Sequence, residues 1–220
     1  MIGTPRVHHR VTDSTNERAK ELALVGAPHG TLVTADEQSA GRGRQGRRWS
    51  APPGSAVLMS LLVREPQEAL PLAAAVAVCE ALEPLETAIK WPNDVWVARE
   101  KLAGILAEGR PQDGWAVLGI GLNVSSHPDD LPATSLRAHG VERSRDELLD
   151  ALLSRLSHWI EAPTRAVLRA WRARDALRGE TVSWAEGRGV AAGIDASGAL
   201  LVDTDAGRVT LDAGEVHLLR

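Results

Sequence analysis

An arginine-rich stretch, GRGRQGRR at residues 41–48, is the part of the sequence best suited to binding an anion. It holds four arginines and three glycines in eight positions, and Trp49 follows directly. Guanidinium groups form charge-assisted hydrogen bonds with carboxylates and phosphates, and glycines let the backbone close around such a ligand. Trp49 can in addition stack on an aromatic base. The alternative interpretation of this stretch is a solvated surface loop.

The same stretch formally satisfies the G-x-G-x-x-G pattern of dinucleotide-binding sites. That pattern needs a helix directly after it, so that the helix N-terminus faces the pyrophosphate. Here RRWSAPPG follows, and its two prolines and glycine prevent a helix. The stretch also lacks the G-K-[ST] ending of a phosphate-binding P-loop. We therefore predict neither of these two nucleotide motifs.

Lysine is rare in this chain, because only three of its 25 basic residues are lysines, namely Lys20, Lys90 and Lys101. Where arginine is the usual cation, a lysine marks a position that needs a compact ammonium group. Lys90 precedes WPND, which reads as a tight turn, so its ammonium is expected at the end of a strand beside a rigid Trp-Pro unit. The alternative for Lys90 is an exposed charge at the strand end.

The composition is that of a folded soluble protein, because the 220 residues are 44% hydrophobic with a formal net charge of -4. Without the four arginines of residues 41–48 the net charge would be -8, which argues against a basic nucleic-acid-binding surface. The sequence contains neither a signal peptide nor the roughly 20 apolar residues of a membrane helix, so we expect a cytoplasmic protein. Cys79 follows Leu72 and Val76 at helical spacing and is expected to be a buried, inert thiol.

Periodicity and turn signals predict a mixed α/β domain over residues 1–178. A helix is expected after Ser14, where S-T-N-E forms a capping box with Glu17, and it is expected to stop at Gly26. The arginine-rich stretch then reads as a long loop between two strands. The expected strands are 30–36, 55–63, 88–91, 95–98, 101–108 and 115–124, and the other expected helices are 71–85, 144–160 and 164–177.

The pattern changes at Gly179. From there to Arg220, short alternating apolar runs are separated by turns rich in Asp and Gly. Five short strands in about forty residues are typical of a small barrel. We therefore predict a second, all-β domain over residues 179–220.

Five segments together, and in this order, resemble the biotin protein ligases, also called biotin–[acetyl-CoA-carboxylase] ligases. The segments are STN at 14–16, EQSAGRGRQGRRW at 37–49, IKWPNDV at 89–95, KLAGIL at 101–106 and GIGLNV at 119–124. Each segment alone is a weak signal, but the arginine-rich loop with KWPND and KLAGIL at these spacings is specific. The resemblance implies an α/β fold of the class II synthetase-like, biotin–lipoate ligase type, with a mixed sheet and helices, followed by a small SH3-like β-barrel.

The resemblance implies an ATP-dependent ligase reaction in two steps. Biotin and ATP, with Mg²⁺, form biotinyl-5'-AMP and release pyrophosphate, and the biotinyl group then passes to one lysine of a biotin carboxyl carrier protein domain. In the first step an anionic carboxylate attacks an anionic α-phosphate, so cations must offset the repulsion and hold the attack geometry. The protein itself is expected to be a monomer or a homodimer.

The resemblance also implies roles for individual residues. Lys90 is implied to bridge the biotin carboxylate and the α-phosphate, and hydroxyl and amide groups suit the neutral ureido ring of biotin. The implied catalytic residues are Lys90 and Arg42. The residues implied to bind biotin are Ser14, Thr15, Asn16, Gln38, Arg42, Gly43, Arg44 and Lys90. The residues implied to bind the nucleotide are Arg44, Arg47, Arg48, Trp49, Asn93 and Asn123, with Asn93 also a candidate Mg²⁺ ligand.

The sequence departs from the family in some respects. Larger members carry an N-terminal helix-turn-helix domain and act as repressors, whereas only 13 residues precede Ser14 here, so no DNA binding is expected. Some members lend an arginine of the small domain to the nucleotide, for which Arg188 and Arg208 are candidates. Three alternative functions remain, namely a lipoate or octanoate ligase, a nucleic-acid-binding protein, and a biotin-binding module without catalysis.

Overall fold

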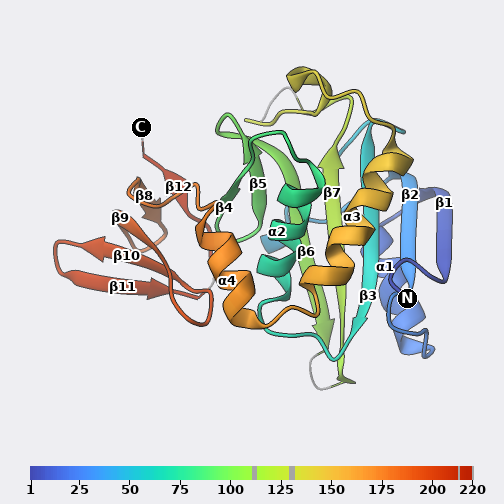
Figure 1. Cartoon of the computed structure of the whole chain (residues 1–220), viewed down its shortest axis with the longest axis horizontal. Coiled ribbons are helices and arrows are strands. Elements are labelled where there is room, and N and C mark those ends of the chain that lie inside the picture. The colour runs from blue at the N-terminus through green and yellow to red at the C-terminus, as the bar shows by residue number, and fades with distance from the viewer. Residues whose placement is uncertain (111–112, 129–131, 213, 220) are drawn as a thin grey trace.

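The computed structural model describes residues 1–110, 113–128, 132–212 and 214–219. A seven-stranded mixed sheet forms the larger part, and a five-stranded antiparallel sheet forms the smaller, C-terminal part (Figure 1). The predicted mixed α/β domain followed by a small all-β domain is therefore confirmed in its architecture. The boundary between residues 178 and 179 remains a prediction, and Arg220 lies outside the described residues.

The large sheet has the strand order β1-β2-β3-β7-β6-β5-β4. β1 and β2 are parallel, and all other neighbours are antiparallel. The strands are β1 (Arg6–Thr12), β2 (Leu32–Gln38), β3 (Ala56–Arg64), β4 (Ala88–Lys90), β5 (Asp94–Val97), β6 (Glu100–Arg110) and β7 (Trp115–Asn123). The predicted strands that became β3, β6 and β7 lie in the middle of this sheet.

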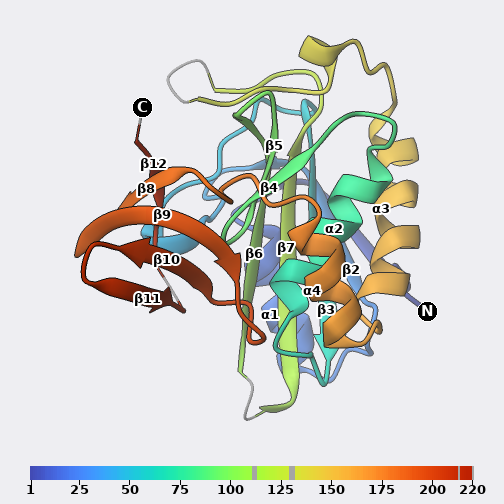
Figure 2. The ribbon, with the colours of Figure 1, turned by 60° about the vertical axis from the view of Figure 1, so that its left-hand side comes forward.

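In the described part of the chain, four α-helices pack on the large sheet or on one another, and they are α1 (Thr15–Leu24), α2 (Leu70–Ala81), α3 (Arg145–Trp159) and α4 (Thr164–Arg172). α2 and α3 cover one face, α4 packs against α2, and α1 lies on the opposite face (Figures 1 and 2). β3 can carry helices on both faces because its side chains alternate between them. Met59 and Leu61 belong to the core under α2, whereas Leu62 packs with Ala19 and Ala23 of α1. Among the described residues, no helix is long and apolar enough to cross a membrane.

The apolar helix α2 lies in the centre of the core and carries the cysteine. Cys79 is buried, and this burial raises the pKa of its thiol to about 11. A thiol with so high a pKa is almost entirely protonated at neutral pH, and only the thiolate is a good nucleophile. The prediction that Cys79 is buried is therefore confirmed, and the raised pKa supports an inert thiol.

The small sheet has the order β11-β10-β9-β8-β12 and is antiparallel throughout. The strands are β8 (Thr181–Trp184), β9 (Gly187–Ile194), β10 (Leu200–Thr204), β11 (Gly207–Leu211) and β12 (His217–Leu218). Five strands were predicted for this region, and all five are present. Val182, Leu200 and Val202 belong to the same buried cluster as α2 and β3, so the two sheets share one core.

The predicted capping box at the start of α1 is wrong. Ser14 precedes the helix, but its side chain makes no capping hydrogen bond, and its backbone N–H donates to Asp13 Oδ1 at 2.6 Å. Glu17, the expected reciprocal partner, contacts Lys20 and Arg42 instead. These ion pairs take the glutamate side chain away from the helix N-terminus.

Three other elements differ from the prediction. α2 ends at Ala81 rather than at residue 85. α4 ends at Arg172 rather than at residue 177, because the chain turns there and Asp175 forms a parallel bridge with Ile89 of β4. β1 was not predicted at all. Its sequence RVHHRVT is largely exposed, so it lacks the apolar alternation that reveals a half-buried strand.

Candidate active site

A cavity of about 870 Å³ lies beside the N-terminal end of α1, over β6 and β7. Segments from all five sequence motifs line it. The predicted site residues that line this cavity are Ser14, Thr15, Asn16, Gln38, Arg42, Gly43, Arg44, Arg47, Arg48, Trp49, Lys90, Asn93 and Asn123. The structure thus brings together every residue of the five motifs that was assigned to biotin, the nucleotide or catalysis, although these residues come from four separate regions of the sequence.

Glycines on β6 and β7 form a flat floor under two of these side chains. A methyl group at Gly121 would collide with the Trp49 indole, and one at Gly119 would collide with the Asn16 amide. At Gly104 an added Cβ would lie 3.0 Å from the Trp49 ring, which is a tight contact. Glycine in the motifs KLAGIL and GIGLNV is therefore needed for the close approach of side chains to the strands.

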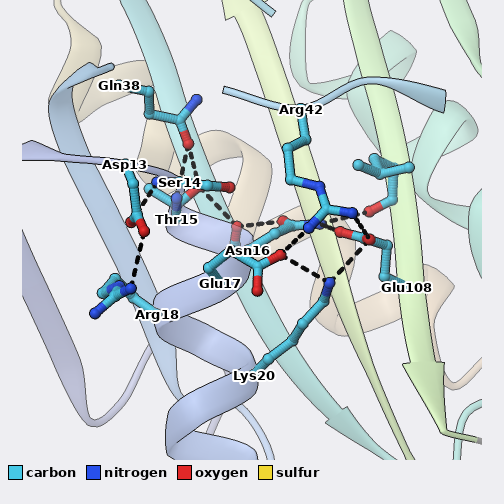
Figure 3. Close-up of polar contacts among 12 residues, drawn as sticks. Asp13, Ser14, Thr15, Asn16, Glu17, Arg18, Lys20, Gln38, Arg42 and Glu108 are labelled. Carbon is cyan, nitrogen blue, oxygen red and sulfur yellow. Dashed lines mark hydrogen bonds and ion pairs between the residues drawn. The ribbon is translucent and has the colours of Figure 1, made fainter. Parts of the chain in front are cut away.

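Neutral hydroxyl and amide groups from α1, β2 and β3 gather beside the start of α1, where Thr15, Asn16 and Gln38 line the cavity (Figure 3). The backbone N–H and Oγ1 of Thr15 donate to Gln38 Oε1 at 2.7 and 3.0 Å. The Ser60 hydroxyl lies 2.8 Å from Thr15 Oγ1 and 2.6 Å from Asn16 Oδ1. Asn16 Nδ2 donates to Glu108 Oε2 at 2.8 Å. This network fixes the orientation of the amides, and its groups match a neutral ring with alternating donors and acceptors.

Arg42 reaches the same part of the cavity from the arginine-rich loop and is held by two carboxylates (Figure 3). Its guanidinium contacts Glu17, and its Nη2 lies 3.1 Å from Glu108 Oε1. The ammonium of Lys20 lies 3.0 Å from Glu17 Oε1 and 2.9 Å from Glu108 Oε1. Burial alone would raise the pKa of Glu108, but the hydrogen bonds from Asn16 and Lys20, with their positive neighbours, lower it overall.

Glu108 was not identified from the sequence, and neither was its partnership with Lys20. One sequence signal could have indicated Glu108. Side chains alternate along β6 with a period of two, so Glu108 lies on the same face of the strand as Gly104 of the KLAGIL motif. The partners themselves lie far away in the chain, because Asn16 and Glu108 are separated by 92 residues.

Two ammonium groups, those of Lys90 and Lys101, line the cavity. Lys90, at the end of β4, has its Nζ 5.5 Å from the centre of the Trp96 ring. Burial lowers the pKa of Lys90, while the carboxylate of Asp94 opposes this shift. Lys101, to which no role was assigned, has its Nζ 2.7 Å from Asp94 Oδ1 and 5.7 Å from the centre of the Trp49 ring. Asp94, the last residue of the WPND turn, is thus the counter-ion of Lys101.

The arginine-rich stretch forms a compact hairpin rather than an open loop. Arg42 and Arg48 form an antiparallel bridge, and Gly43 N donates to the Arg47 carbonyl at 2.8 Å. Trp49 N donates to the Gly41 carbonyl at 3.0 Å, which places the indole over the glycine floor.

Three buried polar atoms of the cavity lining, Trp49 Nε1, Asn123 Oδ1 and His127 Nδ1, have no hydrogen-bond or ion-pair partner within the described part of the chain. Asn123 Nδ2 donates to the Thr134 carbonyl at 3.0 Å, but Asn123 Oδ1 is unpaired. His127 Nδ1 is also unpaired, and this histidine was not predicted as a site residue. Unpaired buried polar groups are rare, and at a cavity they are suited to bind the polar groups of a ligand.

The small domain also reaches the cavity. His217 of β12 is one of the lining residues, and Glu215 contacts Arg47 of the hairpin. The candidates named from the sequence, Arg188 and Arg208, do not line the cavity. Arg208 instead pairs with Asp203 at 2.7 Å on the exposed hairpin of β10 and β11.

The fit of Mg²⁺ to this cavity depends on a small number of oxygen atoms. The described residues contain no group of three or more His, Cys, Asp or Glu side chains that could hold a metal ion. Mg²⁺ usually takes most of its ligands from water and phosphate, with one or two from protein, so such a cluster is not required. Asn93 Nδ2 donates to the Ile105 carbonyl at 2.7 Å, which fixes the amide plane and leaves Oδ1 on its other side. Asn93 therefore fits the role of a single protein ligand.

Comparisons with known proteins agree with this geometry. A family model described as "Biotin/lipoate A/B protein ligase family" matches residues 8–125, and one described as "Biotin protein ligase C terminal domain" matches residues 179–219. The chain is 38% identical to the biotin–[acetyl-CoA-carboxylase] ligase of Mycobacterium tuberculosis, over 95% of this chain and 87% of that protein. It is 34% identical to the bifunctional ligase/repressor BirA of Bacillus subtilis, over 99% of this chain and 75% of that protein.

A solved structure gives the same result. The biotin protein ligase from Aquifex aeolicus, in complex with biotin and ATP, superposes with a TM-score of 0.85 at 30% identity, with 99% of each chain covered. The two family models match both the catalytic and the C-terminal regions of this chain. The chain therefore belongs to the biotin protein ligase family.

Proposed function

We propose that this chain is an ATP-dependent biotin–[acetyl-CoA-carboxylase] ligase. In the proposed reaction the biotin carboxylate attacks the α-phosphate of ATP to give biotinyl-5'-AMP and pyrophosphate. A lysine of a biotin carboxyl carrier protein domain then attacks the mixed anhydride, and AMP leaves. Because the reaction consumes ATP, the cytoplasm is the proposed location.

The arrangement of the cavity is the observation that carries this proposal. Asn16, with the neutral hydroxyl and amide groups bonded to it, lies over Gly119 of β7, whereas the Trp49 indole lies over Gly121 and Asn123 follows two residues on, so the lining has two ends along this strand. Lys90 and Lys101 also line the cavity. A ureido ring suits the first end, an adenine base suits the second, and the two negative reacting groups would meet near the ammonium groups.

The proposed roles follow from charge and position. Lys90 offsets the repulsion between the carboxylate and the α-phosphate, and in the second step it stabilises the departing AMP. Arg42 and Arg44 of the hairpin cover the acyl phosphate and exclude water from it. Trp49 stacks on the adenine, and Asn123 Oδ1 accepts a hydrogen bond from the nucleotide. Mg²⁺, when bound through the phosphates with Asn93 as a protein ligand, would neutralise charge on the triphosphate.

The match of residues 179–219 to the model described as "Biotin protein ligase C terminal domain" supports biotin over lipoate as the substrate. The identity of the acceptor as the carrier domain of acetyl-CoA carboxylase is part of the proposal. A monomer or a homodimer is compatible with it, and the predicted absence of DNA binding remains a prediction that a gel-shift assay would test.

Mass spectrometry of a carrier domain tests the proposal. The domain is incubated with the purified protein, MgATP and either biotin or lipoate, and the acylated lysine is located by peptide mapping. We expect a biotin-sized mass increase on one lysine, with none when ATP is omitted. Modification by lipoate but not by biotin would overturn the substrate assignment, and binding of biotin without pyrophosphate release would indicate a module without catalysis.

A further inference from the structure

The strand that carries Lys90 is short and lies at an edge of the large sheet. β4 has three residues, and in the strand order of the described residues its one neighbour is β5. Such an edge opens easily by local unfolding, whereas a group that must align two reactants needs a fixed position. Contacts from outside the sheet must therefore hold β4, which lies on the side that faces the small domain (Figures 1 and 2).

The segment that leads into the small domain holds the residue before Lys90. Ile89 N donates to the Arg174 carbonyl at 2.7 Å, and Ala176 N donates to the Ile89 carbonyl at 2.9 Å. These two bonds pair the outer edge of β4 with the chain between α4 and β8. The backbone on one side of Lys90 is thus fixed by the connection between the two domains.

The small domain itself holds the residue after Lys90. Trp91 is only 2% exposed, and its indole Nε1 donates to the Gly198 carbonyl at 3.0 Å. Gly198 lies in the turn between β9 and β10, 107 residues away in the sequence. This hydrogen bond joins the Trp-Pro turn of the large domain directly to the small domain.

The turn that provides the Gly198 carbonyl is itself well fixed. Asp195 Oδ1 accepts hydrogen bonds from Ser197 N at 2.8 Å and from Ala199 N at 3.1 Å. A methyl group at Gly198 would meet the Leu72 side chain of α2 at 2.5 Å, so the turn is packed tightly against the core. The acceptor of the Trp91 hydrogen bond therefore has a defined position.

We propose that Trp91 is a positioning residue through which the small domain holds Lys90 in place. This inference rests on the proposed ligase function and extends it, because it gives the small domain a part in the first step. Trp91 and Gly198 are not among the residues that line the cavity, so they act through Lys90 and not by contact with a substrate.

Trp91→Phe tests the inference, because it removes the indole N–H and keeps an aromatic ring. Trp159→Phe is the matched control, since Trp159 is also buried and its Nε1 donates to Glu80 Oε2 at 2.8 Å, away from the cavity. We expect Trp91→Phe to lower kcat for adenylate formation by roughly ten- to a hundredfold, with little change in KM for biotin or ATP. Trp159→Phe should lower Tm but keep kcat.

A second measurement does not depend on activity. Lys90 in the full-length, ligand-free protein is acetylated with acetic anhydride over a range of pH, and hydrogen exchange is followed for residues 88–94. In Trp91→Phe, but not in Trp159→Phe, we expect faster hydrogen exchange of residues 88–94. We also expect the pH at which Lys90 is half acetylated to lie closer to that of an exposed lysine. If Trp91→Phe does not fold, benzothienylalanine at position 91 replaces only the N–H by sulfur and keeps the shape.

The two proposals fail in different ways. Equal kcat and equal Lys90 labelling in Trp91→Phe and Trp159→Phe would overturn the role of Trp91. Absence of biotinyl adenylate with the wild-type protein would overturn the proposed function instead, and the labelling and exchange data would still decide whether Trp91 holds Lys90.

Discussion

Gly119 and Gly121 face the same cavity from one strand, and each makes room for a different side chain. Asn16 lies over Gly119, and Trp49 lies over Gly121. Gly119 and Gly121 are two residues apart on β7, so one pleat repeat of the strand separates the proposed biotin end of the cavity from the proposed nucleotide end.

An added methyl group at these two glycines should separate the two binding functions. Gly119→Ala displaces the Asn16 amide and should raise KM for biotin, whereas Gly121→Ala displaces the Trp49 indole and should raise KM for ATP, each by roughly ten- to a hundredfold. Steady-state pyrophosphate exchange with one substrate varied at a time measures both constants. The variants are controls for each other, because the chemical change and the strand are the same. A rise in the same KM for both would contradict the division of the cavity into two ends.

Lys90→Ala should lower the rate of adenylate formation by at least about a hundredfold, since it removes an ammonium placed where charge develops. Biotin affinity should fall much less, because the neutral end of the cavity is not altered. Single-turnover formation of biotinyl-5'-AMP and equilibrium dialysis with biotin measure the two effects. An unimpaired adenylation rate would remove Lys90 from the mechanism.

The alkaline pH dependence should also report Lys90. Burial lowers its pKa, so the ammonium loses its proton at a lower pH than that of an ordinary lysine. Because the proposed role needs the charged form, the adenylation rate should fall as pH rises through this lowered pKa. Lys90→Arg keeps its charge over this range, so its pH–rate profile should lack the decline, whatever its absolute rate. The same midpoint in both proteins would assign the decline to another group.

Glu108→Gln should weaken biotin binding. It removes the negative charge that Asn16, Lys20 and Arg42 share, and the loss of hydrogen bonds to a charged group costs about 1.5–3 kcal/mol, or roughly ten- to a hundredfold in affinity. Calorimetric titration with biotin measures this change. Glu180→Gln is the control, because it breaks the exposed pair with Arg99 and should leave the affinity unchanged. Wild-type affinity in Glu108→Gln would show that the ion pairs around Arg42 do not contribute to biotin binding.

Much of the fold and of the site was predictable because the signals are local. The apolar runs that became β3 and β7 lie in the centre of the sheet, where continuous hydrophobicity is expected. Residues from every motif line one cavity, because three motifs lie at the start of a helix, in the arginine-rich hairpin or at the turn between β4 and β5, and the other two lie on the neighbouring strands β6 and β7.

The features that were not predicted depend on distant partners. Glu17 has the spacing of a capping residue, yet its ion pairs with Lys20 and Arg42 prevail over that local signal. Glu108 gains its role only when the folded chain places it next to Asn16. Arg188 and Arg208 were candidates because the resemblance implies an arginine of the small domain, but the geometry brings His217 to the cavity and places Glu215 against Arg47.

The position of the tryptophans has a practical consequence. The chain contains seven tryptophans and no tyrosine or phenylalanine, so its near-ultraviolet absorption and its intrinsic fluorescence come from indole groups alone. Trp49 and Trp96 line the cavity, whereas Trp91 and Trp171 are enclosed in the core. The molecule thus carries its own optical probes, and a ligand that covers Trp49 would be detected through the emission spectrum without an added dye.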